Sequence, residues 1–390
     1  MHQPHASLTV PQQAHLAGQG VTRRDFARIA AFLASGTWLT LGSEPALAQL
    51  SQLKGMAPDA VRINANENPL GPCAEALDAV HKALANAGRY QFDLTDAFKQ
   101  AMAAHDGLPV ESVQAYAGSS APLHQAVLAF CSPSRPFVTA DPGYEAGEVA
   151  AKALNAKVIR VPLKADFSHD VKAMAAADPN AGLIYLCNPN NPTGTLTPHA
   201  DIVWLADHLP KGCVLLLDEA YIHVSGAPMA SALVKAGKDV VILRTFSKIY
   251  GMAGLRAGAA LGRPDLLTKI ALWSAGPLPS LGMAAATASL QVADLVAKRR
   301  QLITEIREDT LHFLRAHGVE YVPSVSNCFM VKTPRPGPDV IAALRTHNVY
   351  IGRVWPSWPN HVRVSVGTAA DMAKFQVALL QVLQGNAGPG

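Results

Sequence analysis

The sequence predicts an α/β protein with one large, mostly parallel sheet and a smaller α/β domain at the C-terminal end. Between residues 113 and 262, short apolar runs alternate with helical stretches. This alternation is typical of a parallel sheet covered by helices on both faces. The chain has 390 residues, 49% of them hydrophobic and 16% charged, which suits a globular protein of about two domains. The formal net charge of +4 is scattered along the chain, so nothing indicates nucleic-acid binding.

Residues 1–48 resemble a bacterial twin-arginine signal peptide. Arg23 and Arg24 precede an apolar stretch from Ile29 to Leu41, and the Ala-Leu-Ala sequence at 46–48 is typical of a cleavage site. The apolar stretch is too short to span a bilayer comfortably, so we expect no stable membrane insertion. The expected partner is the twin-arginine export machinery and the expected location is the periplasm, or the cytoplasm if the signal is not used. The alternative is an N-terminal amphipathic helix.

The remaining elements follow in order. Residues 49–80 are predicted as an N-terminal arm, 81–275 as the large domain and 276–390 as the small domain. A helix is expected over Cys73–Ala87. In the large domain the pattern predicts strands at 135–140, 156–163, 182–189, 212–220 and 239–247, and helices at 121–130 and 198–209. In the small domain it predicts helices at 294–318 and 338–348, and strands at 327–333, 349–354 and 361–367.

The five cysteines show neither a C-x-x-C pair nor a metal-binding spacing. Their odd number also argues against a complete disulfide framework. We therefore expect buried free thiols and no metal site.

Three polar motifs follow predicted strands. "CNPNNPTG" carries Asn191, "DEAY" carries Asp218 and Tyr221, and "RTFSK" ends in Lys248. Each motif is ordinary by itself, because turns, helix caps and solvated lysines use the same residue types. However, ligands of parallel sheets bind at the carboxyl ends of the strands. The three motifs together therefore indicate a functional site at that edge.

With "NANENPLGP", "RTFSKIYGMAGLRAG" and "VRVSVGT", these motifs resemble the class I/II pyridoxal-phosphate-dependent aminotransferases of fold type I. The closest resemblance is to the histidinol-phosphate aminotransferase branch, and it extends from about Val61 to Thr368. It implies the fold type I architecture and pyridoxal 5′-phosphate (PLP) as the cofactor.

The resemblance also implies a role for each matched residue around the cofactor ring. Lys248 would form the internal Schiff base, because a lysine amine of lowered pKa is a nucleophile. Asp218 would pair with the pyridine nitrogen and keep the ring protonated. Asn191 and Tyr221 would hydrogen-bond the phenolic oxygen, and Tyr144 would stack on the ring.

The cofactor phosphate would be held from two places. One is the start of the helix after "AGSS", where backbone N–H groups and the helix dipole favour an anion. The other is the region of the catalytic lysine. By resemblance, the phosphate ligands are Ser119, Ser120, Thr245, Ser247 and Arg256. Tyr90 would reach the phosphate of the neighbouring subunit, which implies a homodimer with shared active sites.

For the substrate, Arg363 resembles the arginine that clamps a carboxylate with two parallel hydrogen bonds. Arg353 and Asn66 are further substrate-binding candidates. The segment between Arg353 and Arg363 is short and carries Trp355 and Trp358. Packing against the domain interface explains these tryptophans slightly better than substrate contact does.

The expected reaction is a ping-pong transamination between an amino donor and a 2-oxo acid such as 2-oxoglutarate. The donor is histidinol phosphate, or an aromatic or other amino acid, because the export signal and the short segment after Arg353 depart from the biosynthetic pattern. One alternative is a PLP-dependent decarboxylase, lyase or racemase on the same scaffold. Another is an exported, non-catalytic relative.

Overall fold

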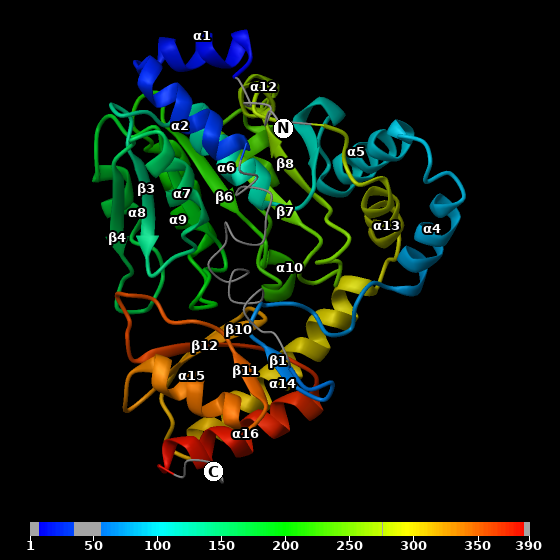
Figure 1. Ribbon diagram of the computed structural model, residues 1–390, viewed down its shortest axis with the longest axis vertical. Helices are drawn as coiled ribbons and strands as arrows, with labels where there is room; N and C mark the ends of the chain where they lie inside the picture. Colours follow the sequence, from blue (N-terminus) through cyan, green and yellow to red (C-terminus); the bar gives the residue numbers. More distant parts are fainter. Residues whose placement is uncertain (1–7, 35–55, 275, 386–390) are drawn as a thin grey trace, which may run out of the picture.

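The computed structural model describes residues 8–34, 56–274 and 276–385 (Figure 1). The proposed cleavage site at 46–48 and residues 49–55 of the predicted arm lie outside the described residues. Figure 1 shows a large sheet with its helices, mainly green, above a smaller group of strands and helices from the C-terminal part, in orange and red.

Seven strands form the large sheet, in the order β2-β8-β7-β6-β5-β3-β4. The predicted strands are β3 (Phe137–Asp141), β4 (Val158–Pro162), β5 (Leu183–Cys187), β6 (Val214–Asp218) and β7 (Val240–Thr245), and they run parallel to one another. The expected mostly parallel sheet is therefore confirmed. β8 (Gly258–Gly262) runs antiparallel to β7 and to β2 (Val113–Tyr116). Its sequence, GAALG, lacks the β-branched and aromatic residues that mark a strand.

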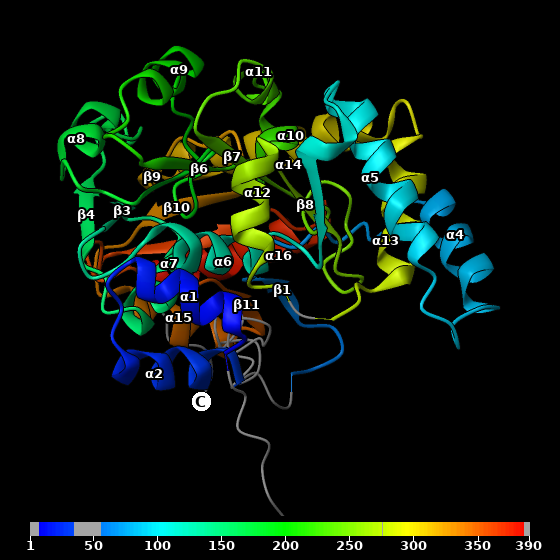
Figure 2. The ribbon, with the colours of Figure 1, turned by 90° about the horizontal axis from the view of Figure 1, so that it is seen from above.

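Helices cover both faces of this sheet (Figure 2). On one face lie α6 (Ser120–Phe130), α7 (Ala146–Ala153) and α12 (Pro264–Ala271), and on the other lie α8 (Val171–Ala176), α9 (His199–Asp207) and α11 (Ser231–Lys235). Successive strand residues point to opposite faces. Tyr185 and Leu216 therefore join the core beside α6, whereas Ile184 and Leu217 join the core beside α9. Burial on both faces explains why these strands are continuous apolar runs.

The C-terminal part contains a three-stranded antiparallel sheet in the order β12-β10-β9. Its strands are β9 (Tyr321–Val322), β10 (Cys328–Lys332) and β12 (His361–Ser365), and its helices are α14 (Leu295–Ala316), α15 (Gly337–Thr346) and α16 (Ala369–Leu383). A separate parallel pair joins β1 (Val61–Ile63) to β11 (Val349–Ile351). The predicted helices and strands of this part are confirmed. The β1–β11 pair also anchors the N-terminal segment to the C-terminal part.

Three further helices lie together at the right of Figure 1. α13 (Ser280–Leu290) packs against α4 (Ala74–Leu84) and α5 (Phe92–Asp106). The helix predicted over 73–87 is confirmed as α4, although it ends at Leu84. α5 lies in a stretch for which no element was predicted. The described residues also include the short helices η2 (Val110–Ser112) and α10 (Ile222–Ser225).

Two N-terminal helices, α1 (Val10–Gly18) and α2 (Arg23–Ala34), pack on the α6–α7 side of the sheet (Figure 2). Leu16 and Ile29 are fully buried and belong to the same core as α6 and α7. The side chain of Asn155, at the end of α7, donates a 2.6 Å hydrogen bond to Asp25 of α2. The apolar stretch proposed for the signal begins on α2 and continues outside the described residues.

Among the described helices, none is by itself long and apolar enough to cross a membrane. α13 and α14, bent by 88° relative to each other, meet that test only as a pair, by length and composition. The five cysteines are all buried and free, as predicted. Burial raises the pKa of the Cys213 thiol to about 12, which keeps it protonated.

Candidate active site

The predicted site residues meet at the carboxyl ends of neighbouring parallel strands. Asp218 is the last residue of β6, and it lies in register with Cys187 of β5 and Leu243 of β7. Asn191 follows β5 and Lys248 follows β7. Because parallel strands end at the same edge, three motifs that are far apart in the sequence converge there, as predicted.

Lys248 lies in a loop, residues 246–257, which we call the lysine loop. The loop is closed by backbone hydrogen bonds from Phe246 to Ala257 and from Gly251 to Lys248. Gly251 has a φ of 68°, and a Cβ there would lie 2.2 Å from the carbonyl oxygen of Gly71, so the turn requires glycine. The Nζ atom of Lys248 donates a 3.4 Å hydrogen bond to the carbonyl of Ala65. It also lies 5.6 Å from the centroid of the Tyr221 ring, at the strand ends.

Asp218 is buried and held on both carboxylate oxygens. One oxygen accepts a 3.0 Å hydrogen bond from the backbone N–H of Ala220, and the other accepts a 2.9 Å hydrogen bond from the hydroxyl of Tyr185. Burial and the neighbouring Asp218 raise the pKa of Tyr185 well above its usual value, so this hydroxyl remains a donor. Sequence reasoning missed Tyr185. The available signal was a polar aromatic residue in an otherwise apolar strand.

Two buried hydrogen-bonded chains connect the substrate candidates to the cofactor candidates. The amide of Asn66 donates to the Tyr221 hydroxyl at 3.1 Å and is itself held by Ser365. Arg363 donates to the Asn191 side chain at 2.9 Å and to the carbonyl of Asn64 at 2.7 Å. Asn66 and Arg363, predicted for the substrate, therefore contact Tyr221 and Asn191, predicted for the cofactor, whereas Ser365 was not predicted.

The five predicted phosphate ligands lie at two adjoining places. Ser119 occupies the N-cap position of α6, without a capping hydrogen bond from its side chain, and Ser120 is the first residue of the helix. Thr245 donates to Ser247 at 3.0 Å, and Arg256 donates to Ser247 at 3.3 Å and to the carbonyl of Ala117 at 3.0 Å. Arg256 therefore bridges the lysine loop and the segment that leads into α6.

The Arg353 side chain lies beside the site, but a carboxylate of the protein already pairs with it. Its guanidinium forms a two-point ion pair with Glu145, and it stacks 4.0 Å from the centroid of the Trp355 indole ring. Trp355 is buried and donates a 2.7 Å hydrogen bond to the carbonyl of Gly143, in the loop after β3. The interface interpretation of Trp355 therefore agrees with its position. Trp358 packs edge-on against Phe167.

The two remaining tyrosines differ in position. Tyr144 follows β3, next to Glu145, and its ring is partly buried against the core that contains Tyr185. Tyr90 lies between α4 and α5, is 70% exposed, and stacks on Phe92 at 5.7 Å. Within its own chain, Tyr90 therefore contacts Phe92 and not the site residues at the strand ends.

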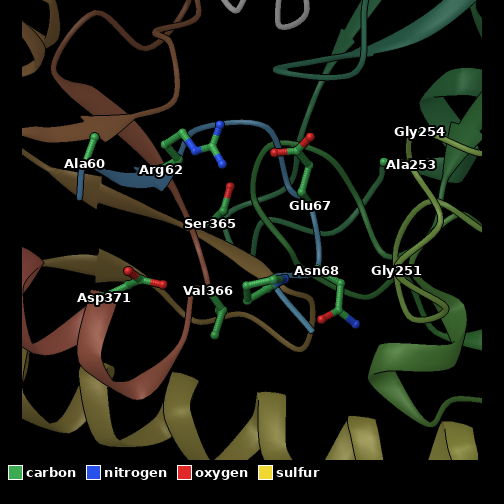
Figure 3. A pocket seen from close by; sticks show the side chains of 12 residues that line it. Ala60, Arg62, Glu67, Asn68, Gly251, Ala253, Gly254, Ser365, Val366 and Asp371 are labelled. Carbon is green, nitrogen blue, oxygen red and sulfur yellow. The ribbon is translucent and has the colours of Figure 1, made fainter. Parts of the chain in front are cut away.

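A cavity of about 410 Å³ adjoins the site at Ser365, which holds Asn66, although none of the predicted site residues lines it (Figure 3). Its walls come from three of the motifs noted in the sequence: Asn68 of "NANENPLGP", Gly251 and Gly254 of the lysine loop, and Ser365 of "VRVSVGT". The fold therefore brings the N-terminal segment, the lysine loop and the end of β12 together around one space.

Residues 58–379 match the family described as Aminotransferase class I and II. The chain belongs to this family. A histidinol-phosphate aminotransferase from Moorella thermoacetica is 32% identical over 333 residues, which cover 83% of this chain and 86% of that relative. An aromatic amino acid aminotransferase from Cutibacterium acnes is 31% identical over 334 residues, which cover 84% of this chain and 94% of that relative.

The fold is also that of solved aminotransferases. The histidinol-phosphate aminotransferase from Sinorhizobium meliloti, solved in complex with pyridoxal-5′-phosphate, superposes with a TM-score of 0.76 and 28% identity. The match covers 86% of this chain and 96% of that one. The predicted family and fold are confirmed: the chain is a transaminase that uses PLP.

The residues present fit this cofactor. Gly118 has a φ of 93°, and a Cβ there would lie 2.5 Å from Nη2 of Arg256, so the backbone and the guanidinium approach as closely as a glycine allows. In the described part of the chain, Arg256 has no carboxylate partner and donates only to neutral oxygens. Asp218 is a buried carboxylate at the end of β6, the strand next to β7, which leads into the lysine loop. A phosphate near Arg256 and a protonated ring nitrogen near Asp218 complement these charges.

Proposed function

We propose that this transaminase moves an amino group from an amino donor to a 2-oxo acid such as 2-oxoglutarate by a ping-pong mechanism, with Lys248 as the covalent anchor of the cofactor. The donor is histidinol phosphate, or an aromatic or other amino acid, and relatives with either kind of name support this range. The observation that carries the proposal is the convergence of Lys248, Asp218 and Arg363 at one edge of the sheet.

Each residue would contribute a distinct function. When bound, PLP supplies the electron sink for removal of the Cα proton. Lys248 would hold the cofactor aldehyde, and its amine, once released by the substrate amine, would accept and return this proton. Asp218, held by Tyr185 and the Ala220 N–H, presents a fixed negative charge. Asn191 and Tyr221 would hydrogen-bond the cofactor oxygen, and their side chains are oriented by Arg363 and Asn66.

Arg363 is suited to bind the substrate acid. Its side chain is buried, its Nε has no hydrogen-bond partner, and no carboxylate of the described chain pairs with it. Burial lowers the pKa of Arg363, although an arginine keeps its charge. A buried cation without a counter-ion is costly, so binding of an anion there is favourable.

The test is a spectral titration of the purified, cofactor-loaded protein. Amino acids and phosphorylated amino alcohols are added one at a time, and the absorbance band of the lysine-bound cofactor is followed as it gives way to that of the amine form. Conversion by histidinol phosphate above all others would support the biosynthetic activity, and conversion by another amino acid would identify a different donor. Failure of every donor would refute transamination by this chain.

Replacement of the lysine tests the anchor directly. In Lys248→Ala, we expect loss of turnover. Any cofactor that still binds should be held non-covalently, so that denaturation alone releases it. Arg256→Lys is a suitable control, because it alters phosphate contact but keeps the covalent anchor. Full activity of Lys248→Ala would contradict the assigned role.

We also propose a homodimer in which Tyr90 reaches the partner's cofactor phosphate. Support comes from exposed apolar side chains on α4, in the segment after it and at the start of α5, namely Leu77, Leu84, Tyr90 and Phe92. Light scattering of the purified protein tests the dimer, and Tyr90→Ala should weaken cofactor retention. A monomer at micromolar concentration, or unchanged retention in the variant, would contradict this arrangement.

Export is a further proposal, supported by the order of the arginine pair, the apolar stretch and the Ala-Leu-Ala sequence. The test is fractionation of bacteria that produce the full chain, beside a variant with Arg23→Lys and Arg24→Lys. We expect the mature protein in the periplasm and retention of the variant in the cytoplasm. Equal cytoplasmic retention of both proteins would contradict export.

A further inference from the structure

Two buried arginines beside the active site differ in their charge partners. Arg353 forms a two-point ion pair with Glu145, with its second hydrogen bond at 3.3 Å. Arg363 donates to an amide oxygen and a carbonyl, and within the described residues no carboxylate pairs with it. One guanidinium is therefore neutralised by the protein, and the other is left for a ligand.

Both guanidinium groups face the same indole ring. The Cζ atom of Arg353 lies 4.0 Å from the centroid of Trp355, and that of Arg363 lies 5.5 Å from it. The two cations thus flank one buried side chain at the substrate end of the site. Together with Glu145, they leave a single net positive charge there.

Glu145 is held in place by the fold. It occupies the N-cap position of α7, where the helix dipole favours a carboxylate, although its side chain makes no capping hydrogen bond. Two residues earlier in the same loop, the carbonyl of Gly143 accepts the hydrogen bond from Trp355. The loop that carries Glu145 and the segment that carries Arg353 are thus fixed to each other by two contacts. The ion pair is part of the folded site, since its arginine is buried and its glutamate is only partly exposed.

We propose that Glu145 determines specificity by neutralising Arg353, so that the site selects substrates with one carboxylate and an otherwise uncharged body. This inference rests on the proposed function, in which Arg363 binds the substrate acid. A monocarboxylate balances the single net charge. A phosphate monoester dianion or a second carboxylate would place an unbalanced negative charge beside Glu145 in a buried site, which is unfavourable. Within the range of the proposed function, the preferred donor is then an aromatic or aliphatic amino acid and not histidinol phosphate, and the preferred acceptor is a monocarboxylic 2-oxo acid and not 2-oxoglutarate.

The test measures binding of unreactive acids, so that it does not depend on turnover. Calorimetry on the cofactor-loaded protein compares 3-phenylpropionate, succinate and inorganic phosphate. The variant is Glu145→Gln, which keeps the shape and removes the charge. The matched control is Glu148→Gln, three residues along the same helix, where the carboxylate pairs with Arg160 instead.

In the wild type we expect 3-phenylpropionate to bind about tenfold more tightly than succinate, a difference of about 1.4 kcal/mol. In Glu145→Gln the affinity for succinate and phosphate should rise about tenfold, since a freed guanidinium is a strong partner for an anion. Affinity for 3-phenylpropionate should change by less than about twofold, and Glu148→Gln should behave as the wild type. An unchanged ratio in Glu145→Gln, or an equal change in Glu148→Gln, would overturn the inference.

If the single variant does not fold, a double variant, Glu145→Gln with Arg353→Gln, tests whether Glu145 neutralises Arg353. It removes one charge of each sign and keeps the net charge, so succinate should bind as in the wild type. A selective tenfold loss of succinate binding would show that Arg353 already serves ligands in the wild type, and would overturn the inference. The same data separate the two proposals. If every donor fails in the spectral titration but Glu145→Gln shows the expected gain in affinity for succinate and phosphate, only transamination is refuted. If a donor is converted but the anion affinities of Glu145→Gln do not change, only the role of Glu145 is refuted.

Discussion

Gly118 offers a direct test of how the chain holds the cofactor phosphate. It lies at a φ of 93°, between the end of β2 and the start of α6. In Gly118→Ala the new Cβ would lie 2.5 Å from Nη2 and 3.1 Å from Cζ of Arg256. Separations this short cannot persist, so either the backbone or the guanidinium has to move.

The size of the effect follows from the contacts that are lost. A non-glycine residue at such a φ costs about 1–3 kcal/mol in the folded protein. Movement of Arg256 breaks its 3.0 Å hydrogen bond to the carbonyl of Ala117 and removes its approach to the phosphate. A hydrogen bond to a charged group contributes about 1.5–3 kcal/mol. We therefore expect the dissociation constant for PLP to rise about 10- to 150-fold.

The assay is titration of the apoprotein with PLP, with chemical denaturation of the apoprotein alongside it. Gly254→Ala is the control, because this glycine lies in the lysine loop without a positive φ, and a Cβ added there would have no heavy atom within 4 Å beyond its chain neighbours. It should change the free energy of unfolding by less than about 0.5 kcal/mol and PLP binding by less than about twofold. If Gly118→Ala bound PLP as tightly as Gly254→Ala, the close approach of Arg256 would not matter for the phosphate.

Other expected outcomes concern Tyr185, Arg256 and His169. Tyr185→Phe removes a hydrogen-bond donor to the Asp218 carboxylate. The value of kcat should then fall about tenfold or more, and the acid limb of the pH–rate profile should move to higher pH. An unchanged profile would contradict the positioning role of Tyr185. Arg256→Ala should weaken PLP retention more than it changes the order of preferred donors, and the reverse pattern in a donor panel would count against the phosphate assignment. Burial lowers the pKa of His169 to about 3. The unfolded chain binds a proton there below about pH 6.5 and the folded chain does not, so stability falls as the pH drops. His169→Asn keeps a hydrogen-bond partner for Thr197. Between pH 7 and 4, the unfolding free energy of this variant should fall by up to about 3 kcal/mol less than that of the wild type. Identical pH slopes for the two proteins in denaturant titrations would refute this.

Much of the fold was predictable because its signals are local. Apolar runs bounded by turn residues predicted the five parallel strands, and helical periodicity predicted α6, α9 and α14. β8 escaped prediction because its glycines and alanines carry no strand signal, and its place between β2 and β7 depends on packing. β1 escaped for a related reason: three residues become a strand only because β11 lies beside them.

The site also combines features that local sequence predicts with features that depend on packing. The sequence by itself determined the order of the motifs, and through them the family, the PLP cofactor and the convergence of Asp218 and Lys248 at one sheet edge, since parallel strands share that edge. Only the tertiary structure decided which side chains face each other across long separations. Glu145 and Arg353 are 208 residues apart, and no local pattern links a glutamate at a helix start to an arginine after a distant strand. Their pairing, and with it the charge offered to a substrate, exists only because the packed fold brings the two segments against Trp355.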